Sequence, residues 1–148
     1  MIPSSVASRS SSVAGWCSPL CPGAIVVPPR FHAYVQASRQ VFDVFHDTTP
    51  NVEGMSIDEA FLEVGGLHRL RGQPSVIASE LRRDVRDRVG LPISVGVART
   101  KHLAKIASGM SKPDGLLVVP IENELTFLHS LPVERIWGIG PATSAKLH

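Results

Sequence analysis

Asp58 and Glu59 are adjacent carboxylates within residues 54–64, a run that otherwise has the apolar composition of a β-strand. Side chains alternate between the two faces of a regular strand, so a fully extended chain would point these two carboxylates in opposite directions. A tight hairpin, with residues 52–57 entering and residues 60–64 leaving, would place both at one exposed edge. The alternative interpretation is that they are ordinary polar residues of a turn.

Three lysines are candidate binding residues, two on a helix face and one on a turn. Lys101 and Lys105 share one face of a helix predicted from residue 100. Lys112 lies on the predicted turn of residues 111–115, between that helix and a strand, where a lysine can direct a point charge at phosphate. The alternative for all three is an ordinary solvated lysine.

A second candidate phosphate contact is the glycine hairpin Gly138-Ile139-Gly140, which precedes a helix predicted to begin at Pro141. Proline is favourable at the first helical position. Backbone N–H groups of such a hairpin form an anion site, which would suit a sequence-independent contact with a DNA phosphate.

Hydrophobic periodicity predicts the elements that position these residues. The predicted order is a strand at 24–27, a helix ending at 48–50, the acidic hairpin, a helix at 75–89, a strand at 92–98, a helix from 100, a strand at 116–119 and a helix at 122–129. The residues predicted to be buried in the three main helices are Phe31, Tyr34, Val35, Ser38, Val41, Phe42, Phe45, Ile77, Leu81, Val85, Leu103, Ile106, Ala107 and Met110. Ser108 is predicted on the lysine face, and Arg83/Asp87 and Asp84/Arg88 as intrahelical pairs.

Composition sets limits on the kind of protein. A chain of 148 residues with 43% hydrophobic content can bury one core, and a net charge of +2 identifies no partner by itself. The sequence has no apolar run long enough to span a membrane, which predicts a soluble, cytoplasmic protein. Cys17 and Cys21 are the only cysteines and make a poor zinc site.

The acidic residues are distributed unevenly, because no Asp or Glu precedes Asp43. The first 42 residues therefore cannot give a carboxylate to a metal ion. Residues 1–15 are rich in Ser and show no periodicity, and we expect residues 1–19 to be disordered.

Five segments in order resemble the palm of the Y-family, DinB-type translesion DNA polymerases. They are residues 56–60, 94–98, 101–108, 112–115 and 136–140, and the resemblance runs from near Leu20 to the end of the chain. It implies an α/β (α+β) fold: a ferredoxin-like palm with an antiparallel sheet and helices on one face. It also implies a palm over residues 20–130 and the start of a helix-hairpin-helix thumb over residues 131–148.

The resemblance implies roles for the candidate residues. Asp58 would bridge two Mg²⁺ ions and Glu59 would bind the ion at the primer terminus, in a two-metal nucleotidyl transfer. Lys112 would contact the incoming triphosphate, and Lys101 and Lys105 would support the template or primer backbone. Gly138, Ile139 and Gly140 would grip DNA backbone without reading bases.

The chain also departs from the family pattern. The family's first strand, with its further aspartates, and the fingers segment find no match here, and neither do most of the thumb, the little finger and the tail that binds the sliding clamp. We therefore expect a monomeric fragment that does not polymerise alone, with primer–template DNA and dNTP as the family's partners.

Two functions follow from these observations. The first is Mg²⁺-dependent, error-prone translesion DNA synthesis, implied by the family. The second is a non-catalytic DNA-binding remnant, in which the glycine hairpin and the Lys101/Lys105 face hold DNA while Asp58 and Glu59 have no catalytic role.

Overall fold

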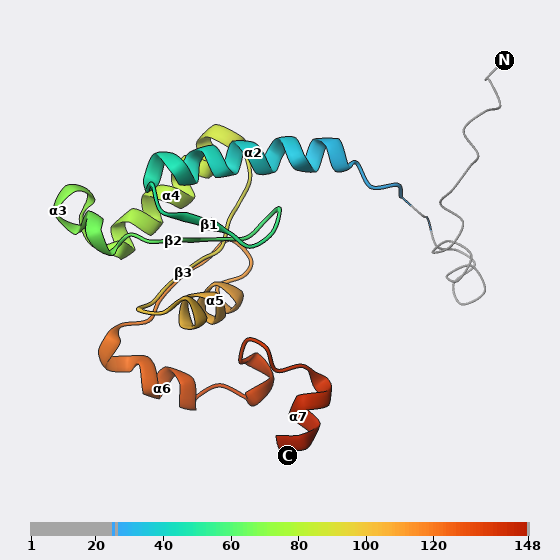
Figure 1. Ribbon diagram of the computed structural model, residues 1–148, viewed down its shortest axis with the longest axis vertical. Helices are drawn as coiled ribbons and strands as arrows, with labels where there is room; N and C mark the ends of the chain where they lie inside the picture. Colours follow the sequence, from blue (N-terminus) through green and yellow to red (C-terminus); the bar gives the residue numbers. More distant parts are fainter. Residues whose placement is uncertain (1–24, 26, 148) are drawn as a thin grey trace. The chain divides into compact units, whose positions relative to one another are not determined.

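The computed structural model describes residue 25 and residues 27–147. The predicted disordered segment, residues 1–19, lies outside this part of the chain, as do residues 24 and 26 of the predicted first strand, while Ile25 and Val27 belong to no strand. Residues 1–31 and 32–148 form two separate units, of which the second contains the sheet and the candidate residues. The second unit is a mixed helix and strand structure, which confirms the predicted fold class (Figure 1).

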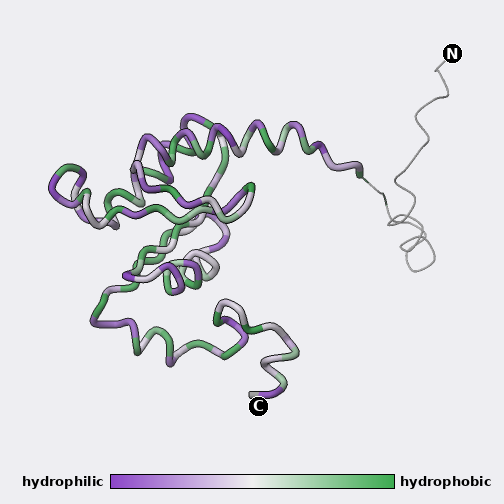
Figure 2. The backbone as a smooth tube through the Cα atoms, in the orientation of Figure 1, coloured by the Kyte–Doolittle hydropathy of each residue, from purple (hydrophilic) through white to green (hydrophobic). Residues whose placement is uncertain are grey.

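Helix α2 (Phe31–Thr48) is amphipathic and ends where the sequence predicts. Its trace alternates between hydrophobic and hydrophilic residues (Figure 2), and Val44 and Phe45 are buried near its C-terminus. The prediction that its N-terminal half is also buried is wrong, since Phe31, Tyr34 and Val35 are exposed. The helix packs on a hairpin whose strands have only three residues each, and the core cluster that they share includes Val44 and Phe45 near the C-terminal end of the helix.

The predicted acidic hairpin forms, with shorter strands and a longer turn than the sequence indicates. Strand β1 (Val52–Gly54) pairs with β2 (Ala60–Leu62) in antiparallel register, with Val52 opposite Leu62. The loop between them, residues 55–59, is closed by a backbone hydrogen bond of 2.8 Å from the Met55 N–H to the Glu59 carbonyl. The hairpin therefore carries Asp58 and Glu59 at its turn.

Strands β3 (Val95–Val97) and β4 (Leu116–Val118) form a second pair, which is parallel. The sequence predicts an antiparallel sheet, so this pairing corrects the prediction. Parallel neighbours need a crossover connection, and helix α5 (Lys101–Met110) supplies it. The two strand pairs are not hydrogen-bonded to each other within the described residues, so the sheet consists of two pieces.

Gly96 allows the close approach of α5 to β3. A Cβ atom at this position would lie 2.1 Å from the Ala104 carbonyl oxygen and 2.3 Å from the Ser108 nitrogen. Thr100 caps the helix by accepting a hydrogen bond of 3.3 Å from the Leu103 N–H. Leu103, Ile106 and Ala107 are buried as predicted, whereas Met110, at the last turn, is exposed.

Helix α4 (Pro74–Val89) completes the core and ends at Gly90, whose φ of 76° is the left-handed conformation typical of a glycine after a helix. Its predicted buried residues Ile77, Leu81 and Val85 are all buried. Leu81 and Val85 join Val44 and Phe45 of α2 in one core cluster over the acidic hairpin. Two helices are thus packed against the hairpin that carries the carboxylates.

Short elements connect and complete the chain. They are η1 (Gly65–Leu67), α3 (His68–Arg71), η2 (Ile121–Asn123), α6 (Glu124–His129), η3 (Val133–Arg135) and α7 (Pro141–Leu147).

The buried Glu124 of α6 forms a bidentate ion pair with Arg99, with one N–O distance of 2.7 Å. The hydrogen bonds from Arg99 lower the pKa of Glu124. This pair joins the start of α6 to the segment after β3.

Candidate functional site

Two side-chain hydrogen bonds restrain the turn at residues 55–59, one from helix α2 and one within the turn itself. Ser38 of α2 donates a hydrogen bond to the Ile57 carbonyl, which ties the turn to the helix that underlies the hairpin. Ser56 Oγ donates to Asp58 Oδ1 at 2.6 Å. Asp58 is exposed, so this serine restrains the carboxylate without removing it from solvent.

Glu59 has a different partner from Asp58. Its Oε2 atom accepts a hydrogen bond of 2.6 Å from Lys105 Nζ, and 44% of its side-chain surface is exposed. The helix face that carries Lys101 and Lys105 therefore faces the acidic hairpin, where Lys101 pairs with Glu53. Ser108, one turn after Lys105, donates its hydroxyl to the Ser94 carbonyl beside β3.

The donor set suits Mg²⁺ in its chemistry. Mg²⁺ takes oxygen ligands, keeps several waters and is commonly held by one or two carboxylates together with substrate phosphates. Asp58 and Glu59 supply two such carboxylates. Each accepts one side-chain hydrogen bond, from Ser56 and Lys105 respectively, which leaves further oxygen lone pairs for a metal ion. Among residues 25 and 27–147 no group of three or more His, Cys, Asp or Glu gathers into a metal site. The pair therefore fits as a partial ligand set.

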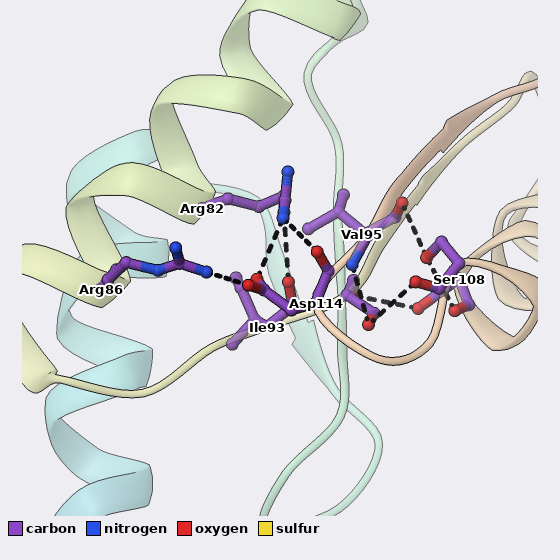
Figure 3. A network of polar contacts seen from close by, with 9 residues as sticks. Arg82, Arg86, Ile93, Val95, Ser108 and Asp114 are labelled. Carbon is purple, nitrogen blue, oxygen red and sulfur yellow. Dashed lines mark hydrogen bonds and ion pairs between the residues drawn. The ribbon is translucent and has the colours of Figure 1, made fainter.

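The turn that carries Lys112 is fixed by arginines of α4 (Figure 3). Arg82 Nη2 donates to Asp114 Oδ1 at 3.0 Å and also to the Asp114 carbonyl, and Arg86 pairs with the other carboxylate oxygen. Asp114 has a φ of 48°, an uncommon conformation for a residue other than glycine. On the same helix, Asp84 pairs with Arg83 instead of the predicted Arg88. Lys112 itself is exposed.

Asp114 gives the Lys112 turn a pH dependence. Hydrogen bonds from Arg86 and then Arg82 lower the pKa of Asp114. A carboxyl whose folded pKa is below its unfolded value stabilises the fold above the unfolded pKa, about 3.9 for Asp, and loses that contribution as the pH falls through the folded pKa. We expect Asp114→Asn to lower the Tm at pH 6, and its difference from the unsubstituted chain to shrink below about pH 4.

The Tm of both chains, followed by circular dichroism from pH 6 to pH 3, would check this expectation. Asp43→Asn, on the exposed face of α2, is the matched control and should leave the pH profile unchanged. Parallel profiles for Asp114→Asn and the unsubstituted chain would contradict the stabilising role of the Asp114 ion pairs.

The glycine hairpin has an open backbone. Gly138 has a φ of 95°, and a Cβ atom added at Gly138 or Gly140 would meet no other atom within 4 Å. Ile139 N–H bonds to the Ile136 carbonyl at 3.1 Å, which closes the hairpin before α7. Trp137, next to it, lies 5.7 Å from His102 and 6.2 Å from Phe61 between ring centroids, so the segment before the hairpin contacts α5 and β2.

A cavity of about 390 Å³ lies elsewhere, between the acidic hairpin and the start of α5. Its lining includes Glu53, Phe61 and Lys101, but neither Asp58, Glu59 nor Lys112. The candidate chemistry thus lies on an exposed turn and not in this cavity.

Sequence patterns missed the contacts that hold the candidate residues. No periodicity or motif in the sequence indicates the hydrogen-bond partners of Ser38 and Ser56, or the arginines that bind Asp114. The pairing of Lys105 with Glu59 joins residues 46 positions apart. Helical spacing predicts which residues share a face, and it contains no information about what that face meets.

Solved structures identify the class of protein. The chain is similar to DinB from Sulfolobus solfataricus, with a TM-score of 0.78 and 29% identity over 89% of this chain and 39% of that chain. It is also similar to the Dbh DNA polymerase of an insertion ternary complex, with a TM-score of 0.77 and 30% identity over 89% of this chain and 39% of the other. A further neighbour is a Y-family DNA polymerase chimera, with a TM-score of 0.72. The class is that of the Y-family DNA polymerases.

The chain belongs to the impB/mucB/samB family, whose model matches residues 10–109, while the IMS family HHH motif matches residues 122–148. The match begins earlier than the start near Leu20 that the sequence segments indicate. DNA polymerase IV 2 of Mesorhizobium japonicum is 55% identical over 86% of this chain, and DNA polymerase IV of Desulfatibacillum aliphaticivorans is 46% identical over 86%. The chain spans only 31% and 32% of the lengths of these relatives.

Proposed function

We propose that this chain supplies the palm part of a DNA-directed DNA polymerase that carries out translesion synthesis by Mg²⁺-dependent nucleotidyl transfer. The observation that supports this best is the position of Asp58 and Glu59 on the exposed turn of a hairpin backed by two helices. The carboxylates of a polymerase must be fixed in place yet reachable by a primer end and a triphosphate. Family membership gives this arrangement its proposed chemistry.

Asp58 and Glu59 are the proposed metal ligands. Mg²⁺ bound there would lower the pKa of the primer hydroxyl and neutralise charge on the triphosphate. Ser56 limits the rotation of the Asp58 carboxylate, and the hydrogen bond from Ser38 to the Ile57 carbonyl holds the backbone of the turn. The protein's contribution is to hold the two carboxylates together on one restrained turn.

Lys112 is the proposed contact for the triphosphate, and the hairpin of Gly138, Ile139 and Gly140 is the proposed contact for DNA backbone. The arginine-fixed turn supports the first assignment, because a restrained backbone limits the volume that the ammonium group can explore. The open backbone at both glycines supports the second, since a phosphate can approach it closely.

The proposal extends to the domain organisation and the partners. Residues 20–130 would form the palm and residues 131–148 the start of a helix-hairpin-helix thumb. Two family models match separate segments, residues 10–109 and 122–148, which supports a division into two parts, although the second match begins nine residues before the proposed boundary. The proposed partners are primer–template DNA and dNTP, with the chain as a monomer in the cytoplasm. Among the described residues no helix is long and apolar enough to cross a membrane.

We propose that the 148-residue chain is inactive when tested by itself. No Asp or Glu precedes Asp43, so the first 42 residues supply no further carboxylate. The described residues offer two carboxylates at the turn and no cluster of three or more metal-ligating side chains. Activity is therefore best tested in a chimera. Residues 20–148 would replace the corresponding segment of the Mesorhizobium japonicum relative, which is 55% identical to this chain. We expect Mg²⁺-dependent, template-directed primer extension by the chimera and none by the 148-residue chain.

The same samples test the alternative, a DNA-binding remnant. The contacts of Lys101 with Glu53 and of Lys105 with Glu59 weaken that alternative, because both ammonium groups already have carboxylate partners. Salt-sensitive DNA binding by the 148-residue chain, together with a chimera that binds DNA but extends no primer, would favour the remnant over the polymerase.

A further inference from the structure

Lys105 lies between a proposed metal ligand and an aromatic ring. Its Nζ atom is 2.6 Å from Glu59 Oε2 and 5.6 Å from the centroid of the Trp137 ring. Only 24% of the Lys105 side chain is exposed. A half-buried ammonium group that has both a carboxylate and an aromatic face as partners is held more firmly than a surface lysine.

The neighbouring lysine provides an internal comparison. Lys101 lies one turn earlier on α5, pairs with Glu53 and is 5.7 Å from the centroid of Phe61. Its side chain is 59% exposed, and Glu53 belongs to β1 rather than to the acidic turn. The two lysines have the same charge and the same kind of neighbours, but only Lys105 contacts a proposed metal ligand.

We propose that Lys105 acts as the counter-ion of Glu59 in the metal-free chain, and that a divalent cation must displace it to bind at the acidic turn. This inference rests on the proposed function, because it takes Asp58 and Glu59 to be the metal ligands. A cation on Glu59 would lie close to the ammonium group, and like charges at such a distance repel each other. Lys105 therefore positions the Glu59 carboxylate and weakens metal binding.

Displacement of Lys105 has a second consequence, at Trp137. The ammonium group that leaves Glu59 also changes its distance from the indole ring that it now faces at 5.6 Å. Trp137 is partly exposed and lies next to the glycine hairpin proposed to bind DNA. The Trp137 environment should therefore change when a metal ion binds at the acidic turn.

Mn²⁺ binding to the 148-residue chain, measured from the electron paramagnetic resonance signal of free Mn²⁺ at constant ionic strength, tests the competition. We expect Lys105→Met to lower the Kd about fivefold or more and Lys101→Met to change it less than about twofold. Lys105→Arg keeps the charge and should restore the original Kd. A side chain with a purely structural role would not tighten metal binding when it is removed.

The fluorescence of Trp137, in a Trp16→Phe background that leaves it as the single tryptophan, tests the displacement. Mg²⁺ should change the emission of the otherwise unsubstituted chain and of Lys101→Met, but not that of Lys105→Met. If Lys105→Met fails to fold, Glu59→Gln removes the same ion pair. It should change the emission without metal and abolish the response to Mg²⁺, and an unchanged emission would overturn the inference.

Asp58→Asn distinguishes a failure of the proposed metal site from a failure of the proposed role of Lys105. If Mn²⁺ binds Asp58→Asn as well as it binds the unsubstituted chain, the metal site is not at the acidic turn and the proposed function fails. If binding depends on Asp58 but Lys105→Met and Lys101→Met have equal effects, only the role of Lys105 is overturned. Weaker binding by Lys105→Met would also overturn it.

Discussion

Asp58→Asn, introduced into the chimera that contains residues 20–148, is expected to reduce the rate of primer extension by about 10³-fold, equivalent to about 4 kcal/mol of transition-state stabilisation. The amide has nearly the shape of the carboxylate but lacks the charge that holds Mg²⁺ beside the reacting groups. Steady-state primer extension at saturating DNA, over a range of Mg²⁺ concentrations, measures the loss. Glu59→Gln should act in the same direction.

Asp87→Asn is the matched control for this experiment. It makes the same chemical change on an exposed position of α4, away from the acidic turn, and should leave the rate within about twofold of the parent chimera. If Asp58→Asn extends primers as fast as Asp87→Asn, then Asp58 is a turn residue and not a metal ligand. Retained DNA binding by Asp58→Asn would show that the loss concerns chemistry and not folding.

Gly96→Ala is expected to have the largest effect on stability, a loss of about 3 kcal/mol or failure to fold. The new Cβ atom would overlap the backbone of α5, 2.1 Å from the Ala104 carbonyl oxygen, and backbone atoms of a packed helix cannot rotate away as a side chain can. The whole helix would have to move from β3. Urea unfolding followed by circular dichroism measures the free energy of unfolding.

Gly109→Ala makes the same substitution on α5 with the opposite expected sign. A Cβ atom at Gly109 would meet no atom within 4 Å, and alanine is favoured over glycine in a helix by up to about 1 kcal/mol. Gly109→Ala should therefore stabilise the chain slightly. Equal destabilisation by the two substitutions would mean that α5 does not pack on β3 as closely as the structure indicates.

Much of the fold could be predicted because local patterns determine it. The buried line of Ile77, Leu81 and Val85 follows helical spacing, and Gly90 ends that helix as predicted. The strand predicted at residues 92–98 forms over a shorter range, Val95–Val97. The exposed Met110 and the exposed start of α2 could not be predicted, because burial there depends on how far a neighbouring element extends.

The sequence predicted that the candidate carboxylates lie on a turn, but it did not predict their contacts. The carboxylate pair and its position on a turn follow from sequence alternation, and the family comparison is consistent with the resemblance that the five segments suggest. The assignments of Asp58, Glu59, Lys112 and the glycine hairpin remain predictions. Their test is chemical, by the substitutions above.

The sequence by itself determined which residues are acidic, where the hairpin turns and which family the chain resembles, because these depend on neighbours along the chain. Only the tertiary structure decided that Lys105 meets Glu59, that two arginines of α4 hold the turn of Lys112, and that β3 and β4 are parallel. Each of these joins segments distant in the chain, and such contacts depend on how helices and strands pack, which local periodicity does not encode.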